Sequence, residues 1–521
     1  MTPLSPHLLL TLPVAVPLAT LALCALLHSR PRAQRAVSLL GSAGLLLASL
    51  LLLGAVFDGA VIATQFGDWA APFGISFAAD LLSAAMVVIT GLMAVAVSVY
   101  ALADGARERE RAGFHPLYHG LLLGVTGAFL TGDLFNLYVW FEIMLIASFG
   151  LLVQGGTRAQ LDAGVKYVVL NLLVTTLFLL GVGLLYGLTG TLNMADLARS
   201  LPQVQNQGLV ATLAVLFLLA FGAKAAVFPL FFWLPAAYHT ASAPVVAIFA
   251  ALLTKVGVYA LLRCFTLVFA GVHGLIGPVV GVLAALTMVT GVLGAAAHYD
   301  VRRILSFHIV SQIGYMLVGL AVATPLAIAG AVLYVLHHIV VKANLFLIAG
   351  VLRVAGGSYD LKRIGGLHRS APLLALLFVV PALSLAGLPP LSGFWAKFVV
   401  IRSSLEAGHV ALAVTALAVG ALTLYSMLKI WNEAFWKAPT ALSQQAAGAW
   451  RDRGRERVLL LAPVAALAGI TLTIGLWSEP FVDFALRSAD QLLGHEAYTQ
   501  AVLGNAAPVT APPAPPEELL P

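Results

Sequence analysis

Long apolar runs recur along nearly the whole chain, separated by short polar stretches or by breaks that contain glycine and proline. Most runs reach the roughly 18 residues with which a helix crosses a hydrocarbon core about 30 Å thick. The pattern therefore predicts an all-α polytopic membrane protein of about fourteen transmembrane helices. The expected spans are 8–28, 36–57, 76–103, 115–132, 134–154, 163–187, 209–228, 242–267, 275–297, 302–321, 326–352, 371–388 continuing through 391–404, 409–435 and 457–478.

Composition agrees with a membrane protein and argues against several other classes. Hydrophobic residues make up 61% of the chain and charged residues only 10%, against about 25% charged residues in soluble domains. The formal charge of +6 comes from short basic clusters between apolar runs, so we expect no nucleic-acid partner. Cys24 and Cys264 form no ligand or redox spacing, and the chain has no Gly-rich nucleotide fingerprint. We therefore expect no cofactor and no metal site.

The distribution of Lys and Arg predicts how the chain is oriented. Basic residues in short loops are retained on the cytoplasmic side of a membrane. They cluster in alternate loops, at 30–35, 107–111, 158–166, 302–303, 353–369 and 437–457, whereas the other loops and the tail hold only Arg199, Arg402 and Arg487. The bias predicts that both termini lie outside, in agreement with an even number of spans.

Several charged residues fall inside the predicted spans. A cation at a helix centre costs roughly 2.5–3.5 kcal/mol on insertion scales, so such residues are candidates for a functional site. The cations are Lys224, Lys255, Arg263, Lys342, Lys397 and Lys429, of which Arg263 and Lys429 lie nearer helix ends and can snorkel to the interface. Glu142, in "LFNLYVWFEIMLIASFGLL", is the clearest carboxylate near a span centre. A structural ion pair remains an alternative role for it.

Histidines near these lysines suggest a proton relay. "LYVLHHIVVKANLFL" places His338 and Lys342 four residues apart on one helix face, with His337 just before. Imidazole can both accept and donate a proton near neutral pH, and a buried Lys or Glu can exchange protons there too. A row of such groups would pass protons along, and a proton bound at one group would alter the proton occupancy of the neighbouring group. A histidine satisfied by hydrogen bonds in a polar core is the alternative. His239, His298 and His308 lie near predicted helix ends.

Prolines predict two broken helices beside lysines. Pro229 follows Lys224 by five residues, and a proline there clashes with the carbonyl of residue 225. Pro389 and Pro390 interrupt a later span and precede Lys397. Irregular backbone is tolerated at membrane depth only where it is enclosed by protein or lines a hydrated cavity. Two broken helices are typical of transporters with inverted repeats.

These features divide the chain into five parts. Residues 1–114 hold helices 1–3, residues 115–267 a first repeat of five helices (helices 4–8), and residues 268–436 a second, inverted repeat (helices 9–13). A cytoplasmic loop and helix 14 occupy 437–487. Residues 488–521 end in Ala-Pro repeats, and we expect that tail to be extended or held by a partner.

The chain resembles the antiporter-like membrane subunits shared by Mrp-type sodium/proton antiporters, respiratory complex I and membrane-bound hydrogenases. The resemblance covers most of the chain and rests on the Glu142 helix, "AKAAVFPLFFWLPAAYHTASAPVVAIFAALLTKVGVYALLR", "HYDVRRILSFHIVSQIGYM", the helix with His337 and Lys342, and "GLPPLSGFWAKF". It implies fourteen helices with two inverted five-helix repeats and a hydrophilic axis parallel to the membrane. In that scheme Glu142 and Lys224 form a Glu–Lys pair, Lys255 and His338 continue the relay, and Lys397 ends it.

Within this family, the lysine at the helix 12 position and a length near 500 residues favour the D-type subunits of Mrp antiporters. The resemblance then implies a bacterial cell membrane, a hetero-oligomeric complex with a large A-type subunit and several smaller ones, and transport of H+ and Na+. A proton-pumping subunit of complex I or of a hydrogenase is the alternative. A purely structural role in the membrane and a stand-alone solute carrier remain open as well.

Overall fold

The computed structural model describes residues 5–104 and 106–504. Its N-terminal part contains the long helices α1 (Pro6–Leu26), α2 (Pro31–Val56) and α3 (Leu81–Ala101), and the short α4 (Ala106–Arg111). An antiparallel hairpin of β1 (Ile62–Gln65) and β2 (Ser76–Ala79), which the apolar pattern did not predict, joins α2 to α3. Prolines at the first turns of α1 and α2 fit positions where a backbone N–H would lack a helical partner.

The next part contains one broken helix. It consists of α5 (Phe114–Leu130), α6 (Leu134–Val153), α7 (Arg158–Thr189), α8 (Met194–Ser200), α9 (Gln207–Ala225), α10 (Trp233–Tyr238) and α11 (Ala243–Arg263), which continues as a π-helix to Val268. Side-chain oxygens of Asp133, Thr157 and Asn193 cap the starts of α6, α7 and α8.

The following part repeats this order of elements. It consists of α12 (His273–Ala297), α13 (Val301–Val322), α14 (Pro325–Gly356), α15 (Leu367–Ser370), α16 (Pro372–Ala386), α17 (Ser392–Glu406) and α18 (Val410–Ile430), which continues as a π-helix to Trp436. Helices α7 and α14 are each 32 residues long. Asp133 and Asp300 cap α6 and α13, and each forms an isolated antiparallel bridge, to Asn193 and Asp360. The order of elements agrees with two repeats, whose exact extent and inverted relation remain a prediction.

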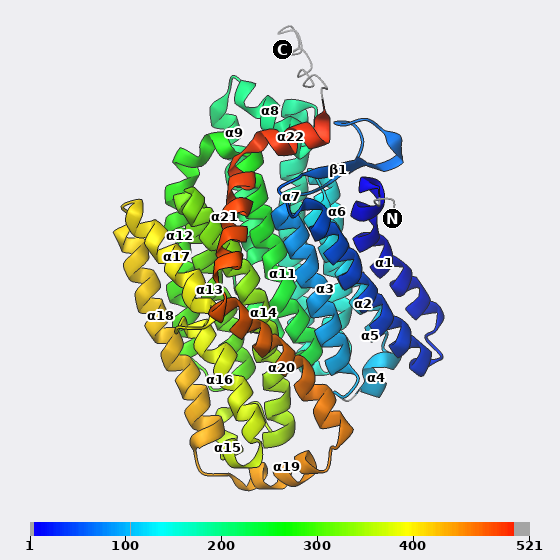
Figure 1. Ribbon diagram of the computed structural model, residues 1–521, viewed down its shortest axis with the longest axis vertical. Coiled ribbons are helices and arrows are strands. Elements are labelled where there is room, and N and C mark those ends of the chain that lie inside the picture. The colour runs from blue at the N-terminus through cyan, green and yellow to red at the C-terminus, as the bar shows by residue number, and fades with distance from the viewer. Residues whose placement is uncertain (1–4, 105, 505–521) are drawn as a thin grey trace.

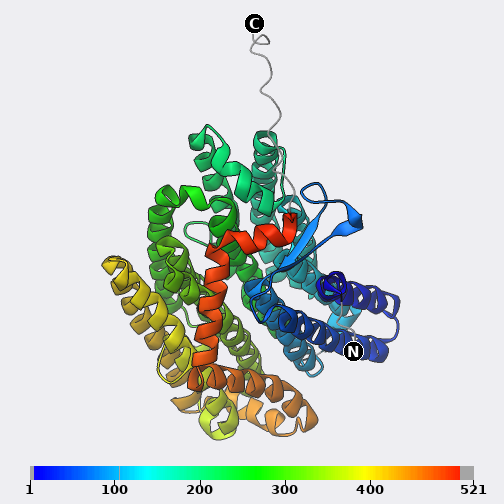
Figure 2. The same cartoon turned by 45° about the horizontal axis from the view of Figure 1, so that its top comes forward.

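The C-terminal part differs from the sequence-based expectation. It contains α19 (Ala441–Arg451), α20 (Arg455–Leu476), α21 (Glu479–Leu493) and α22 (His495–Leu503). We expected an extended tail from residue 488, but helix continues to Leu503 because one face of α21 and α22 is apolar and buries Ala489, Leu492 and Val502. The rest of the expected tail, residues 505–521, lies outside the described residues. Figures 1 and 2 show α20 and α21 lying across the bundle and α22 crossing its end beside α8.

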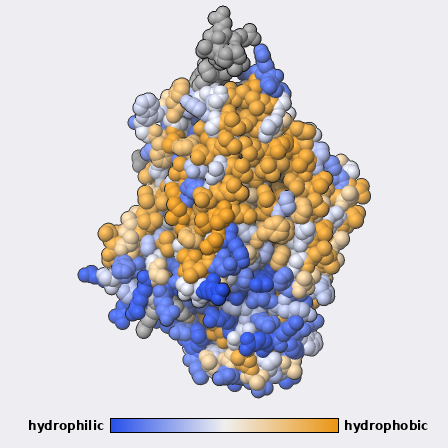
Figure 3. Space-filling view, turned by 180° about the vertical axis from the view of Figure 1, so that it is seen from behind, coloured by the Kyte–Doolittle hydropathy of each residue, from blue (hydrophilic) through white to orange (hydrophobic). Residues whose placement is uncertain are grey.

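Twelve helices among the described residues are long and apolar enough to cross a membrane. The two other predicted spans correspond to α5, with 17 residues, and to the broken pair α16 and α17, with 15 residues each. Figure 3 shows a broad hydrophobic surface over most of one face and polar residues gathered at one end. The chain is therefore an all-α polytopic membrane protein, while the number of fourteen crossings remains a prediction.

Helices α11, α13 and α14 form the centre of the bundle. The most apolar stretch of α11 is wholly buried, and those of α13 and α14 are 94% buried, whereas those of α1, α2 and α18 are only 33% buried. Helix α14 contacts α11, α13, α16, α17, α20 and α21. Most of the candidate side chains therefore come from helices that protein surrounds on all sides.

Candidate functional site

The first break lies between α9 and α10. Helix α9 ends at Ala225, Ala226 adopts a left-handed conformation with φ of 63°, and α10 begins only at Trp233. The Trp233 indole donates a hydrogen bond to the carbonyl of Ala223 (3.0 Å), which also accepts from the N–H of Ala226 (3.1 Å), and the backbone N–H of Phe228 donates to Thr287 on α12 (3.0 Å). Neighbouring protein groups thus satisfy the interrupted backbone, as an enclosed site in a membrane requires. Pro229 lies inside this break.

Lys224 occupies the last turn before the break. Its side chain is buried, its Nζ donates to Oδ1 of Asn171 on α7 (3.3 Å), and the same Nζ lies 5.6 Å from the ring centre of Phe141. Asn171 in turn donates to the carbonyl of Tyr167 (2.8 Å). Asn171 is not among the residues predicted from the sequence, although a lone amide in the apolar run 163–187 was a visible signal.

Glu142 is a neighbour of Lys224 and not its direct partner. It lies next to Phe141 on α6, is half-buried, and is the carboxylate that acts electrostatically on Lys224. Among the described residues no ion pair shorter than 4.0 Å joins the two, and the buried Oε1 of Glu142 has no protein hydrogen-bond partner. Buried polar groups are nearly always hydrogen-bonded, so this carboxylate is suited to a bridging water or a proton.

Lys255, His338 and Lys342 form the centre of the site. The Nζ of Lys255 donates to the carbonyl of Ala250, and that of Lys342 to the carbonyl of Leu305 on α13 (3.2 Å). Lys255 and Lys342 interact electrostatically with each other and with His338, whose ring nitrogens have no protein hydrogen-bond partner. All three side chains are fully buried. The structure thus brings together a lysine of the first predicted repeat with a histidine and a lysine of the second.

Close backbone packing connects this centre to the first break. A Cβ atom on Gly257 of α11 would lie 2.6 Å from the backbone nitrogen of Ala225, so the two helices touch directly there. Lys255 is two residues from this contact and Lys224 is next to Ala225. Between the two lysines the structure shows packing and no hydrogen bond.

His308 is a further member of the site, and its place differs from the expectation. The sequence suggested a position near a helix end, but His308 lies in the second turn of α13 and is fully buried. Neither ring nitrogen has a protein partner, and the lysines at 342, 397 and 429 act on it electrostatically. The four-residue spacing of His308 and Gln312, continued by Tyr315, was the sequence signal for a polar face on this helix.

The second break lies between α16 and α17 and places Lys397. Helix α16 ends at Ala386, Gly387 follows with φ of 92°, and α17 begins at Ser392 after Pro389 and Pro390. The Nζ of Lys397 donates to the carbonyl of Ala386 (2.9 Å) and lies 4.9 Å from the ring centre of Tyr315. Although Lys397 follows its prolines and Lys224 precedes Pro229, both lysines lie beside interrupted backbone.

His337 connects the centre to the second break. Its Nδ1 lies 2.8 Å from the hydroxyl of Ser392 at the start of α17, and that hydroxyl lies 3.0 Å from the hydroxyl of Ser384. Lys397 and Lys342 both act on His337 electrostatically. His337 therefore lies toward the second break, whereas His338 lies toward Lys255 on another side of α14.

Two tyrosines complete this region. Tyr334 donates to Oε1 of Gln312 (2.5 Å) and stacks on Tyr315, with ring centres 5.1 Å apart. The ring of Tyr334 also lies 5.8 Å from that of His337. Phenol, amide and imidazole groups thus lie between the central lysines and Lys397.

Arg263 and Lys429 have structural partners. Arg263 forms a buried ion pair (2.6 Å) with Asp80, the residue that caps the start of α3, and its guanidinium lies 5.0 Å from the ring centre of Tyr498 on α22. Lys429 donates to the carbonyls of Ala296 and His298 (both 2.7 Å) at the C-terminus of α12, where a cation is favourable.

A cavity of about 380 Å³ with mixed polar and apolar walls opens beside the first break. Its lining includes His239, His298, Arg303, Asp162 and Lys166. Nδ1 of His239 lies 2.9 Å from the carbonyl of Pro235, and Nε2 lies 3.2 Å from an Arg303 nitrogen, so the neutral ring donates at Nδ1 and accepts at Nε2. Partial burial, which outweighs that backbone contact, lowers the pKa of His239. In the described part of the chain, no cluster of three or more His, Cys, Asp or Glu could hold a metal ion.

Comparison with known proteins gives consistent matches over nearly the whole chain. The sequence profile described as "NADH:quinone oxidoreductase/Mrp antiporter, TM" matches residues 131–423. The chain is 44% identical over 495 residues to the D subunit of the Na(+)/H(+) antiporter of Alkalihalophilus pseudofirmus, a match that covers 95% of this chain and 99% of that protein. It is 39% identical over 499 residues to the D subunit of the Na(+)/H(+) antiporter of Bacillus subtilis, covering 94% and 98%. A chain in the solved Mrp complex from Dietzia sp. DQ12-45-1b superposes with a TM-score of 0.88 at 36% identity, covering 96% of this chain and 99% of that one.

Proposed function

Because this chain belongs to the NADH:quinone oxidoreductase/Mrp antiporter family of membrane subunits, we propose that it is the proton-translocating D subunit of a multisubunit Na+/H+ antiporter. It is a component of a transporter and not a catalytic enzyme. Its partners are the other subunits of the antiporter complex, a large A-type subunit together with smaller ones, within the lipid bilayer.

One observation supports proton transport by this chain most directly. Lys224, Lys255, Lys342 and Lys397 are buried, and each hydrogen-bonds to a neutral oxygen, either an amide side chain or a backbone carbonyl. A buried lysine without a carboxylate contact can release its proton without leaving an uncompensated negative charge. These lysines are therefore suited to bind and release protons repeatedly, as a purely structural ion pair is not.

The proposed relay runs from the first break to the second. Protons enter from the cavity at His239, reach Lys224 beside Glu142, and continue through Lys255, His338 and Lys342. They arrive by way of His308 and His337 at Lys397. The groups that lack protein partners along this path are suited to water bridges. Because Lys255 and Lys342 act electrostatically on each other and on His338, gain of a proton at one of these sites favours its loss at another. That alternation is the proposed coupling to Na+ efflux.

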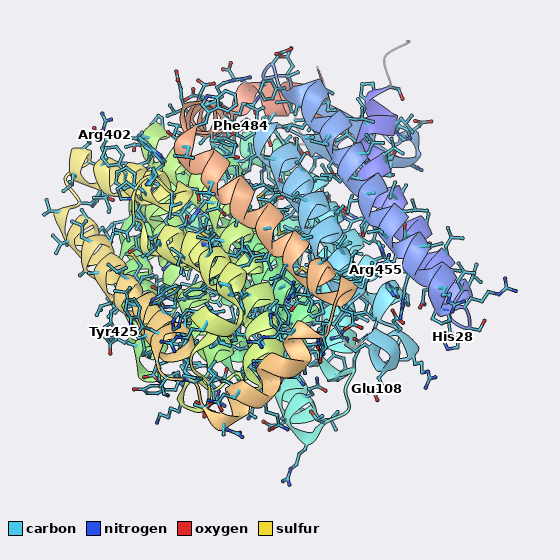
Figure 4. All side chains as sticks on the ribbon, turned by 60° about the horizontal axis from the view of Figure 1, so that its bottom comes forward. His28, Glu108, Arg402, Tyr425, Arg455 and Phe484 are labelled. Carbon is cyan, nitrogen blue, oxygen red and sulfur yellow. The ribbon has the colours of Figure 1, made fainter. Side chains whose placement is uncertain are left out.

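The orientation follows from the ends of the bundle. Figure 4 shows His28, Glu108 and Arg455 at one end and Arg402 and Phe484 toward the other. We assign the first, basic end to the cytoplasm of a bacterial cell, and the start of α1 and the end of α22 to the outer side. The cavity at His239 then opens to the cytoplasm.

The function is tested in everted membrane vesicles that contain the whole complex. We expect Lys224→Ala to reduce Na+-dependent dissipation of ΔpH by at least about tenfold at normal assembly, because the variant lacks a proton-binding group. Lys437→Ala is the matched control, since Lys437 pairs with Glu433 (3.0 Å) and lies outside both the relay and the His239 cavity. Full transport by Lys224→Ala complexes would refute the relay and favour a structural role for the chain.

A proton-pumping subunit of complex I is the second candidate, because the matching family profile includes NADH:quinone oxidoreductase in its description. Purification of the tagged chain from its native membrane separates the two. Small antiporter subunits would support the Na+/H+ antiporter, whereas iron–sulfur subunits would support the redox complex.

A further inference from the structure

A pocket unrelated to the proposed relay lies at the basic end of the α1–α2 hairpin. It has a volume of about 900 Å³, and its wall includes the side chains of Arg30, Arg32, Arg35, Arg111 and Glu110. We refer to it as the basic pocket. Figures 1 and 4 place this hairpin, with His28 at its tip, at the outer edge of the bundle.

The charge of the basic pocket is strongly unbalanced. Glu110, its one carboxylate, is already held by Arg35 through two contacts of 2.6 and 2.8 Å. Arg30 and Arg32 are exposed, and among the described residues neither forms an ion pair or a side-chain hydrogen bond. No side chain caps the start of α2, and its first residues, 31–34, line the same pocket. Guanidinium groups and free amides at a helix start both favour a phosphate group.

The surroundings of the pocket favour a lipid over a soluble anion. Leu23 and Leu26 at the end of α1 are 49% and 80% exposed, and Leu40 of α2 is 71% exposed. Such leucines provide an apolar surface for acyl chains on the same hairpin that carries the arginines. The α1–α2 hairpin is also among the least buried parts of the molecule, so little protein of this chain excludes lipid there.

We propose that the basic pocket binds the phosphate headgroup of an anionic phospholipid whose acyl chains lie along the exposed leucines of α1 and α2. Arg30 and Arg32 hold the phosphate, while Arg35 stays on Glu110. The lipid thereby fixes the least buried helices of the chain to the bilayer interface.

Native mass spectrometry of the purified antiporter complex tests this proposal. The complex is incubated separately with phosphatidylglycerol, phosphatidylcholine and inorganic phosphate. We expect the parent complex to retain one phosphatidylglycerol molecule. The fraction of complexes that retain it should fall roughly tenfold in the double variant Arg30→Gln/Arg32→Gln, since each basic group near the bilayer adds to the attraction for anionic lipid. Arg455→Gln/Arg457→Gln is the matched control, because it removes the same charge at the same end of the molecule but outside the pocket, and it should retain the lipid.

Three outcomes would overturn the proposal. The first is that the complex retains phosphatidylcholine as well as it retains phosphatidylglycerol. The second is that inorganic phosphate occupies the pocket as fully as phosphatidylglycerol does. The third is a cross-link from a photoreactive side chain at position 32 to another protein of the complex, which would identify protein as the occupant.

Discussion

At the scale of single residues, the neutral partner of Lys224 is central to the proposed chemistry. Asn171 offers Lys224 an amide oxygen, which stabilises the ammonium less than a carboxylate would. Asn171→Asp would convert this contact into an ion pair that holds the proton on Lys224. We expect ΔpH dissipation in vesicles to fall roughly tenfold while assembly is unchanged, and Asn171→Gln to retain most transport.

A more active Asn171→Asp variant would contradict the idea that proton release from Lys224 matters. The pH profile adds a second measurement. Transport by the aspartate variant should recover as the pH of the assay is raised, because alkaline solution favours proton loss from the paired lysine.

His239 gives a pH dependence of stability. Burial lowers its pKa in the folded chain, so its contribution to stability is fully present above the unfolded value near 6.5 and is lost as the pH falls through the lower folded value. We expect the melting temperature of the complex to drop less between pH 7.5 and pH 5.5 in His239→Gln than in the parent. His298→Gln, in the same cavity, is the comparison. An equal fall of the melting temperature in the parent and both variants would refute the assignment of this pH dependence to His239.

The candidate residues differ in how visible they were in the sequence. A charge inside an apolar run has few explanations other than function, which is why Glu142, Lys224 and Lys397 stood out. Asn171 and Ser392 did not, because neutral polar residues occur in many membrane helices and spacing along the chain does not reveal contacts between distant helices. The functional roles of all these residues remain predictions.

At the scale of elements, the second break depends on Gly387. Its φ of 92° disfavours a side chain, and a Cβ there would lie 2.6 Å from Cδ of Lys397. Gly387→Ala should therefore displace Lys397, reducing transport several-fold and destabilising the chain by about 1–2 kcal/mol. Gly448→Ala, where a Cβ meets nothing within 4 Å, is the control for vesicle transport and thermal unfolding. Unchanged transport in Gly387→Ala would show that the position of Lys397 is not critical.

Helices made of long apolar runs were predictable, including α20, whereas the amphipathic helices α21 and α22 were not. The expected span 134–154 corresponds to the helix Leu134–Val153, and 302–321 corresponds to Val301–Val322. Long apolar runs are this predictable because a helix satisfies all of its backbone hydrogen bonds in lipid. Helices α21 and α22 were missed, since their apolar residues follow a helical period within a polar sequence and the protein they cover lies far away in the chain. The β1–β2 hairpin was too short and too weakly patterned to be predicted.

At the scale of the whole molecule, the Asp80–Arg263 ion pair joins three distant parts of the chain. Asp80 precedes α3, Arg263 ends α11, and Tyr498 of α22 lies against the guanidinium. Breaking a buried pair leaves one charge uncompensated, at a cost of about 3–5 kcal/mol. We expect Arg263→Gln to lower the melting temperature and the yield of assembled complex. Arg263→Gln/Asp80→Asn should recover part of the loss, and a double variant no better than the single one would contradict this explanation.

The assigned orientation predicts the reactivity of introduced cysteines. The native Cys24 and Cys264 are buried, so labelling by a membrane-impermeant maleimide should report new sites. We expect His28→Cys to react in everted vesicles and Arg402→Cys in right-side-out vesicles, as the two residues lie at opposite ends of the bundle. The reverse result would invert the topology and place the His239 cavity outside.

The long central helix α14 limits which insertions and deletions the gene can tolerate. His337, His338 and Lys342 contact different neighbours from one continuous helix that protein surrounds on nearly all sides. One residue inserted between His338 and Lys342 would turn the two groups apart by about 100° and would rotate everything beyond it into the wrong neighbours. We therefore expect insertions and deletions to be absent from this helix throughout the family and to accumulate in the segment between α18 and α20, where no relay group depends on the count.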